Sequence, residues 1–127
     1  MHSVNQLLPP EQMLWTINHA EDKILIFHKD FLPLVEKFSP QLKPVEKYII
    51  CTDDSVVPDT KLKPIYEYED LLNGASPKYD FTELDERTPA GLNYTTSTTG
   101  LPKGCWFTHR AIMPHTIRRT IFHTLGY

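Results

Sequence analysis

Short apolar runs alternate with segments of helical periodicity in the first half of the chain. Lys23–Phe27 (KILIF) and Tyr48–Thr52 (YIICT) are short, largely apolar runs, a pattern typical of buried strands. Between them, Phe31–Phe38 predicts a short helix with one apolar face. The residues on that face, at helical spacing, are Leu34, Val35 and Phe38.

Two further helices are predicted on either side of these strands. The first begins at Pro9 and Pro10, because proline is tolerated in the first turn of a helix, and ends near Asn18 or His19. It would turn its apolar residues, Met13, Leu14 and Ile17, toward the core. The second helix, Ile65–Leu72, would close at Asn73-Gly74 with a left-handed cap.

The rest of the chain is expected to hold polar connections, two strands and a last helix. Asp53–Lys63 and residues 75–89 are polar connections, and the strands are Gly91–Thr95 and Cys105–Phe107. Thr108 would cap a helix that starts at His109 and that contains a proline, Pro114, able to bend it. The first residues of the chain resemble the end of a strand.

Strands that alternate with helices predict an α/β fold with a parallel sheet. We therefore expect a partial parallel-sheet layer with flanking helices, and uncovered sheet edges that could support self-association. In a parallel sheet both faces are normally covered by helices. This chain offers few helices for that purpose, which suggests part of a larger domain.

Composition narrows the possible partners and the compartment. The 127 residues are 40% hydrophobic and 23% charged, with a formal net charge of -3 and a pI near 6.0. This balance gives no basic footprint for nucleic acid. No apolar run approaches the roughly 20 residues of a transmembrane helix, and the N-terminus lacks a secretory signal pattern. Cys51 and Cys105 are expected to be reduced, buried thiols of a cytoplasmic protein.

Several other residue types favour structural roles over chemistry. His115 and His123 could share a helix face, but no third ligand follows at a suitable spacing for zinc. Trp15 and Trp106 are expected to pack in the interior. The acidic residues form two groups that we expect on solvated surfaces, one on the Ile65–Leu72 helix and one in the following connection: Glu67, Glu69 and Asp70, then Asp80, Glu83, Asp85 and Glu86.

The stretch Asn93–Gly104, NYTTSTTGLPKG, is the strongest chemical signal in the chain. A strand that ends in hydroxyl side chains and turns at glycine can present backbone N–H groups and hydroxyl donors to one anion. Gly100 and Gly104 allow the backbone to approach a ligand closely, and Lys103 adds a positive charge for a phosphate. The order of residues differs from the Walker A loop. A nucleotide-phosphate site is favoured over a plain polar turn.

YTTSTTGLPKG resembles the phosphate-binding signature of the adenylate-forming (AMP-binding) synthetases, a family that includes acyl-CoA synthetases, firefly luciferase and peptide-synthetase adenylation domains. The following CWFTHRA is similar to the strand and helix start after that signature. INHAEDKILIF, FLPLVEKF and PVEKYIICTD are similar to medium- and long-chain fatty acyl-CoA synthetases in particular. The resemblance spans nearly the whole chain.

This resemblance implies an ATP-dependent fatty acid–CoA ligase that uses ATP, Mg²⁺ and CoA. A carboxylate would attack the α-phosphate of ATP, and the thiol of CoA would then displace AMP. The phosphate loop would be residues 94–104, with Thr95 also a candidate Mg²⁺ ligand and His109 a neighbour of the nucleotide. The residues expected to line the phosphates are Thr95, Thr96, Ser97, Thr98, Thr99, Gly100, Leu101, Pro102, Lys103 and Gly104.

The chain also departs from the family pattern. Family members usually carry glycine at the position of Ser97, and often asparagine, proline and arginine where this chain has Asn5, Gln6 and Leu7. If the position of Ser97 needs a positive φ, serine would strain the loop. The resemblance further implies that residues 1–127 are part of a longer N-terminal domain, truncated at both ends and inactive alone. The alternative is a non-catalytic remnant or small interaction module that binds no nucleotide.

Overall fold

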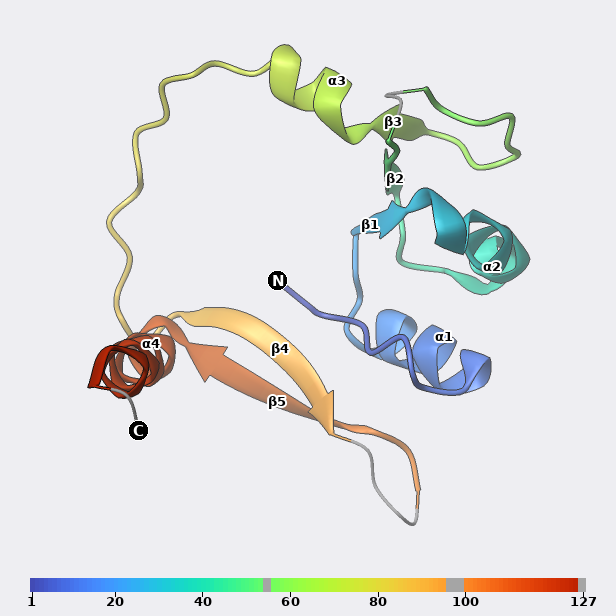
Figure 1. The fold of residues 1–127 in the computed structure, drawn as a ribbon. Coiled ribbons are helices and arrows are strands. Elements are labelled where there is room, and N and C mark those ends of the chain that lie inside the picture. The colour runs from blue at the N-terminus through green and yellow to red at the C-terminus, as the bar shows by residue number, and fades with distance from the viewer. Residues whose placement is uncertain (54–55, 96–99, 126–127) are drawn as a thin grey trace. The chain divides into compact units, whose positions relative to one another are not determined.

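The computed structural model describes residues 1–53, 56–95 and 100–125. It divides into two compact units, drawn together in Figure 1. The sheet unit comprises Leu8–Asp80, and the hairpin unit comprises Met1–Leu7 and Phe81–Tyr127. Residues 75–88, which lead from the last helix of the sheet unit to the first strand of the hairpin, contain no helix or strand.

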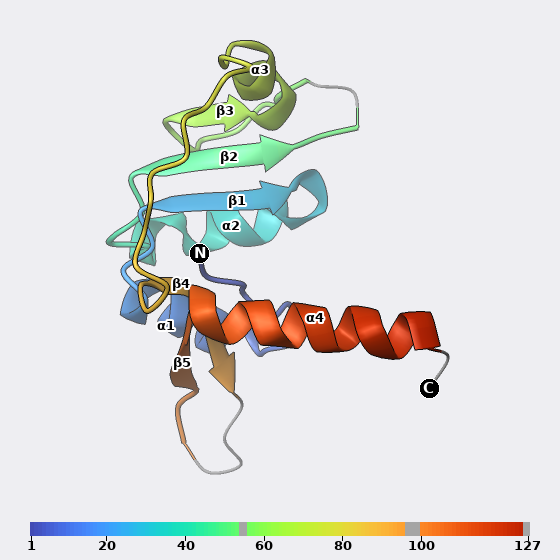
Figure 2. The same cartoon turned by 90° about the vertical axis from the view of Figure 1, so that its left-hand side faces the viewer.

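Three parallel strands form the centre of the sheet unit. β1 (Ile24–His28), β2 (Lys47–Cys51) and β3 (Ile65–Glu67) lie side by side in that order, and Figure 2 shows their arrows pointing the same way. Ile26 pairs with Ile49, and Ile49 with Tyr66. The two apolar runs KILIF and YIICT thus become neighbouring strands, and the predicted α/β fold with a parallel sheet is confirmed.

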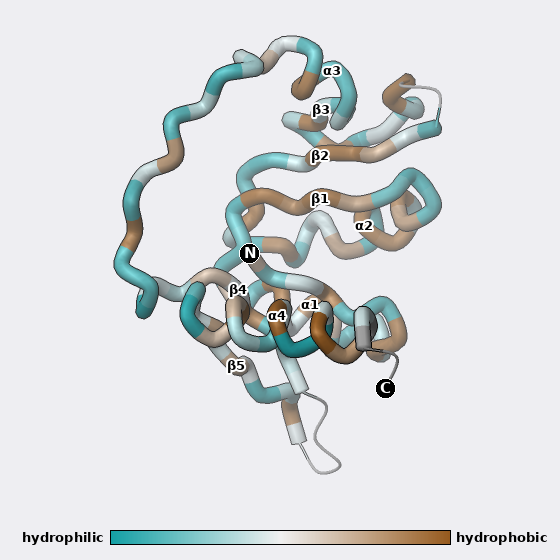
Figure 3. The backbone as a smooth tube through the Cα atoms, turned by 60° about the vertical axis from the view of Figure 1, so that its left-hand side comes forward, coloured by the Kyte–Doolittle hydropathy of each residue, from teal (hydrophilic) through white to brown (hydrophobic). Residues whose placement is uncertain are grey.

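Helices cover one face of this sheet. α1 (Pro10–His19) begins at a proline, as the sequence predicts, and α2 (Leu32–Phe38) follows β1 through the 3₁₀ turn η1 (Lys29–Phe31) and precedes a second one, η2 (Ser39–Gln41). Figure 3 shows the apolar stretches of β1 and β2 in brown. The buried apolar side chains of the unit are Leu8, Met13, Ile17, Phe27, Val35, Phe38, Leu42, Tyr48, Ile50 and Leu62.

The opposite face of the sheet keeps apolar side chains exposed. Side chains alternate between the two faces along each strand, so Phe27 and Ile50 enter the core while Ile24 and Ile26 project from the other face. Ile24 is 51% exposed and Ile26 56% exposed. A parallel sheet is normally covered on both faces, so this face is the less protected side of the unit.

The helix expected over Ile65–Leu72 is replaced by a strand and a shorter helix. Ile65–Glu67 forms β3, and α3 (Tyr68–Asn73) starts only after Glu67. The parallel ladder to Tyr48–Ile50 of β2 holds these three residues extended, and tertiary pairing overrides their local pattern. The helix ends at Gly74, but its φ of -84° is right-handed. The predicted left-handed cap is therefore wrong.

The predicted strands near the end of the chain form a hairpin and not part of the parallel layer. β4 (Pro89–Thr95) and β5 (Lys103–Thr108) pair antiparallel in a separate two-stranded sheet. Met1–Ser3 runs beside β4 with a parallel bridge from His2 to Leu92, and Leu92 N–H donates to the Met1 carbonyl at 2.8 Å. The first residues thus behave as the end of a strand, as the sequence indicates.

A 17-residue helix, α4 (His109–Leu125), follows the hairpin. The hydroxyl of Thr108 accepts a hydrogen bond from the N–H of Ala111 at 3.2 Å, so the predicted cap is confirmed. Pro114 lies inside the helix. Among the α4 side chains that the structure describes, the large apolar ones that are exposed are Ile112, Met113, Ile117, Ile121 and Phe122.

Three expectations about burial are wrong. Cys51 is only half-buried because it lies on the uncovered face of β2, and Cys105 is exposed on the two-stranded hairpin, which offers less cover than a full sheet. Trp106, on the same hairpin, is 66% exposed. Trp15 is half-buried and stacks on His19 with ring centroids 4.4 Å apart.

Candidate functional site

The hairpin brings the two ends of the candidate phosphate loop together. Thr95, the last residue of β4, pairs with Lys103, the first residue of β5. The Thr95 hydroxyl donates to the Lys103 carbonyl at 3.4 Å. Both side chains are exposed at the same end of the hairpin, so the Lys103 ammonium group is available there to an anion, while the Thr95 hydroxyl directs its proton to the Lys103 carbonyl.

The two glycines of the loop are subject to different structural constraints. Gly100 has a φ of +131°, which other residues rarely adopt. Gly104 lies opposite Tyr94, and a Cβ there would meet Leu92 Cδ1 at 3.2 Å. Gly100 is therefore favoured by the backbone conformation, whereas a side chain at position 104 would require Leu92 to shift by a few tenths of an ångström.

The remaining predicted loop residues divide into described and undescribed ones. Pro102 is buried and Leu101 is 56% exposed. The central hydroxyl residues Thr96, Ser97, Thr98 and Thr99 lie outside the described residues. The phosphate-lining role assigned to the segment 94–104 stays a prediction.

His109 lies at the other end of the hairpin from the loop. It follows Thr108, which pairs with Pro89, whereas Lys103 begins β5. At roughly 3.4 Å per residue, the six steps from Lys103 to His109 span about 20 Å. The N–H of His109 donates to the Thr88 carbonyl at 3.2 Å. Its place beside the nucleotide remains a prediction.

An ion pair that the sequence reasoning missed holds the start of α4. Arg110 Nη1 lies 2.9 Å from Glu86 Oε1, and the Arg110 N–H donates to the Glu86 carbonyl at 2.8 Å. The opposite charges lie 24 positions apart with no regular spacing. The sequence contains no signal that pairs them, and Glu86 was expected to be merely solvated.

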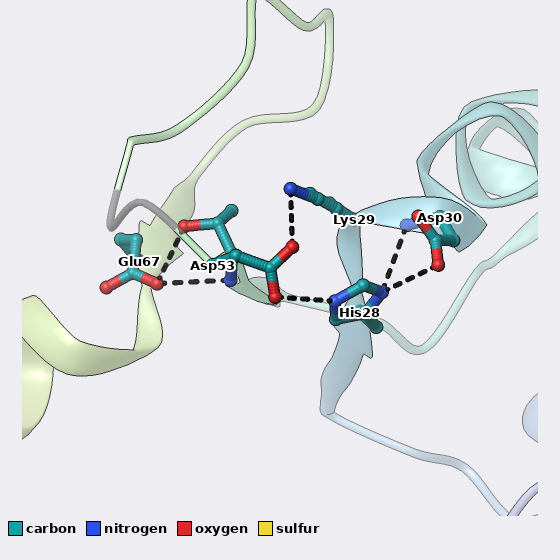
Figure 4. Close-up of polar contacts among 6 residues, drawn as sticks. His28, Lys29, Asp30, Asp53 and Glu67 are labelled. Carbon is teal, nitrogen blue, oxygen red and sulfur yellow. Dashed lines mark hydrogen bonds and ion pairs between the residues drawn. The ribbon is translucent and has the colours of Figure 1, made fainter.

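A second polar cluster lies where β1 and β2 end (Figure 4). His28 Nδ1 is 3.1 Å from Asp30 Oδ2, and His28 Nε2 is 3.7 Å from Asp53 Oδ1. Lys29 Nζ lies 2.6 Å from Asp53 Oδ2. The hydrogen bond and charge of Lys29, with a smaller contribution from His28, hold the pKa of Asp53 below its ordinary value. Since the carboxyl ends of neighbouring parallel strands share an edge, this meeting could have been expected.

Glu67 is another polar residue whose role the sequence did not indicate. Its side chain was expected on a solvated helix face but is 2% exposed. Glu67 Oε2 accepts hydrogen bonds from the N–H groups of Glu69 and Asp70, at 2.6 and 3.1 Å. Oε1 accepts from the N–H and the hydroxyl of Thr52. Burial raises the pKa of Glu67, but these hydrogen bonds outweigh it and leave the pKa lowered.

The described residues contain neither a metal-ligating cluster nor a membrane-spanning helix. No group of three or more histidine, cysteine, aspartate or glutamate side chains there could hold a metal ion. No helix in the same part of the chain has the length and hydropathy to cross a membrane.

Comparisons with known proteins place the chain in a family. The family model described as AMP-binding enzyme matches residues 1–124. A 3-methylmercaptopropionyl-CoA ligase of Ruegeria pomeroyi is 35% identical over 127 residues, which are 100% of this chain and 24% of that ligase. A long-chain-fatty-acid–CoA ligase of Thermus thermophilus is 36% identical over 121 residues, or 95% of this chain and 21% of the ligase. The chain thus spans about a quarter or less of these relatives.

A solved structure shows the same fold. The crystal structure of an anthranilate CoA ligase in complex with anthranoyl-AMP matches with a TM-score of 0.73 and 23% identity, over 86% of this chain and 20% of that one. The family model covers nearly every residue, and it includes the segment YTTSTTGLPKG that first indicated the family. The chain belongs to the AMP-binding enzyme family.

Proposed function

We propose that residues 1–127 form part of an ATP-dependent fatty acid–CoA ligase and contribute its ATP-phosphate loop, residues 94–104. The observation that carries the proposal is the pairing of Thr95 with Lys103, which sets a hydroxyl and an ammonium group at one end of the hairpin. The ligases among the relatives support the reaction class. The choice of a fatty acid as substrate rests on the long-chain-fatty-acid–CoA ligase of Thermus thermophilus.

In the proposed reaction, a fatty acid carboxylate oxygen attacks the α-phosphorus of ATP and pyrophosphate leaves. The thiolate sulfur of CoA then attacks the acyl carbon, and AMP leaves. The contribution of this chain is electrostatic. Lys103 and the backbone N–H groups of the loop would stabilise negative charge on the phosphate oxygens and hold the leaving pyrophosphate.

The proposed loop could share a Mg²⁺ ion with the nucleotide. The exposed Thr95 hydroxyl is an oxygen ligand of the kind that Mg²⁺ accepts. The described residues supply no cluster of carboxylates to complete a shell, and phosphate oxygens of the nucleotide could provide further ligands. When bound, the ion would neutralise charge on the phosphates.

Other features of the proposed function rest on the sequence. His109 is proposed to line the nucleotide site away from the phosphates. A cytoplasmic location, the absence of nucleic acid as a partner and self-association through uncovered sheet edges are proposed in the same way. By itself the chain should not complete the ligase reaction, because it spans about a quarter or less of the relatives.

Nucleotide binding by the chain tests the proposal. Titration with ATP and Mg²⁺, followed by calorimetry, should give a Kd that rises by about ten- to a hundredfold in Lys103→Ala, since a charge-assisted hydrogen bond is worth about 1.5–3 kcal/mol. Lys47→Ala is the matched control, because Lys47 is exposed on the sheet unit and its loss removes the same charge. It should leave the Kd unchanged.

Ser97→Gly separates the proposal from the alternative of a non-catalytic remnant. Restoring the family's usual glycine should strengthen ATP binding in an otherwise functional loop. If neither the native chain nor Ser97→Gly binds ATP, the remnant alternative is supported. Equal weakening by Lys103→Ala and Lys47→Ala would contradict the loop assignment.

ATP–pyrophosphate exchange with fatty acids tests the expected inactivity. The chain should show no exchange above a protein-free blank at high protein concentration, while a complete ligase of the family gives turnover in the same assay. Clear exchange by the chain would show that residues 1–127 suffice for adenylation.

A further inference from the structure

The last residue of α3 is the only asparagine of the chain that precedes a glycine. The residues that follow the asparagines are Gln6, His19, Gly74 and Tyr94. An Asn-Gly pair is chemically reactive, because glycine has no Cβ to shield its backbone nitrogen and lets the backbone bend toward the preceding side chain. Asn73 and Gly74 are both exposed, so water reaches the pair.

The Asn73 side chain can also turn toward that nitrogen. The described residues offer it no hydrogen-bond partner. The side chain of Asn18, in contrast, is held at both ends, since Nδ2 donates to the Gln41 carbonyl at 2.9 Å and Oδ1 accepts the Lys43 N–H at 3.2 Å. Asn18 is therefore a suitable internal reference for Asn73.

We propose that Asn73 is a site of spontaneous deamidation, with water as the co-reactant. The Gly74 backbone nitrogen attacks the side-chain amide carbon of Asn73 and loses its proton. The bond from that carbon to the side-chain nitrogen breaks, and ammonia leaves after taking up the proton. Water then adds to one carbonyl of the resulting succinimide and breaks its C–N bond, which gives aspartate or isoaspartate at position 73.

The folded helix restrains this reaction. The Gly74 N–H donates to the Asp70 carbonyl at 3.1 Å, so the attack requires this bond to open. Opening costs little, because α3 has only six residues and short helices are marginally stable. Its last turn is weakly packed, with Leu71 41% exposed and Leu72 50%. Residues 75–88, which follow it, contain no helix or strand (Figure 1).

The product loosens α3 further. A carboxylate at position 73 lies at the negative end of the helix, and it follows Asp70 and Glu69 by three and four residues, spacings at which like charges repel. Isoaspartate also adds a carbon to the main chain, which disrupts the bond from Gly74 to Asp70. Glu67 opposes opening at the other end of α3, because its carboxylate accepts the N–H groups of Glu69 and Asp70.

Incubation of the full chain at neutral and mildly alkaline pH, followed by peptide mass spectrometry, tests the proposal. The deamidated fraction at position 73 should grow with time, and faster at higher pH, because the attacking nitrogen must lose its proton. Hydroxylamine should cleave the succinimide form between Asn73 and Gly74. Gly74→Ala should abolish both signals, and Asn18 should stay unmodified.

Rates in buffer and in urea separate the chemistry from the opening of α3. Glu67→Gln weakens the start of the helix and should raise the rate in buffer roughly tenfold or more, the factor by which a lost hydrogen bond to a charged group shifts an opening equilibrium. In urea the native sequence and Glu67→Gln should react at one common rate, while Gly74→Ala stays slow.

Three results would overturn the inference. One is a folded chain that keeps Asn73 intact over a period in which the chain in urea is modified. Another is deamidation that Gly74→Ala leaves unchanged or that occurs first at Asn18. The third is an equal rate in buffer for the native sequence and Glu67→Gln, which would show that α3 does not control the reaction.

Discussion

At the scale of single residues, Glu67 shows how a carboxylate can be buried without a cation. Two of its hydrogen bonds come from the first turn of α3 and two from Thr52, directly after β2. Orphan N–H groups at a helix start need acceptors, and a carboxylate there also meets the positive end of the helix. Glu67 therefore joins β2 to the β3–α3 corner.

We predict that Glu67→Gln lowers the melting temperature at pH 7 by roughly 5 °C or more. An amide presents one acceptor atom and one NH₂ group to donors that both carboxylate oxygens now satisfy. Because the pKa of Glu67 is lowered from 4.5 in the folded chain, its contribution is present above about pH 4.5 and is lost as the pH falls through the folded value.

Thermal melts of the native chain and of Glu67→Gln between pH 3 and 7 measure this effect. The difference between them should shrink toward pH 3. Glu69→Gln removes the same charge from an exposed neighbour and should cause a much smaller change. Equal losses in the two variants would show that charge alone, and not the buried hydrogen bonds, is responsible.

At the scale of elements, α4 keeps a proline where helices rarely tolerate one. Pro114 is the sixth residue of a helix that begins at His109, past the first turn where proline is harmless. It lacks the N–H that would bond the Arg110 carbonyl. Its side chain is exposed, so the local cost is not recovered by packing within the described residues.

We predict that Pro114→Ala raises the helicity of the chain and stabilises α4 by about 2–3 kcal/mol. The alanine N–H restores the missing hydrogen bond, and the exposed proline ring leaves little packing to lose. Far-UV circular dichroism with thermal melts measures both effects. His115→Ala, at the next exposed position, should gain only a few tenths of a kcal/mol. A gain in Pro114→Ala no larger than this would contradict the explanation.

The elements also show which parts of the fold were predictable. The strands at Ile24–His28 and Lys47–Cys51 and the helix at Pro10–His19 have strong local signals, and their bounds were expected to within one residue. β3 was not predictable, because the three residues Ile65–Glu67 carry no strand pattern of their own. They are extended because they pair with β2. The antiparallel pairing of β4 with β5 depends on the turn between them, which alternation of apolar residues does not specify.

At the scale of the whole molecule, both units expose apolar surface. In the sheet unit, Ile24 and Ile26 project from the uncovered face of β1. In the hairpin unit, Trp106 is 66% exposed and Phe107 39%. Exposed apolar patches commonly mark association sites or cause aggregation, which favours self-association of the chain.

We predict that the sedimentation coefficient of the chain rises with protein concentration. The double variant Ile24→Lys/Ile26→Lys should reduce this rise, because two ammonium groups on the sheet face oppose its burial. Val56→Lys, at another position that is 61% exposed, is the matched control and should change little. Sharp, well-dispersed amide NMR spectra from a concentration-independent monomer would contradict the prediction.

The sequence by itself determined the family, the α/β class and the segment 94–104 as the candidate loop. These depend on residue order and local periodicity, such as the Gly-Leu-Pro-Lys-Gly run and the apolar strands. The tertiary structure decided the partners of polar side chains: Glu67 with Thr52, Glu86 with Arg110, and His28 with Asp53. Each pair joins segments 15–25 positions apart, and only strand pairing and helix placement bring such segments within hydrogen-bonding or ion-pair distance.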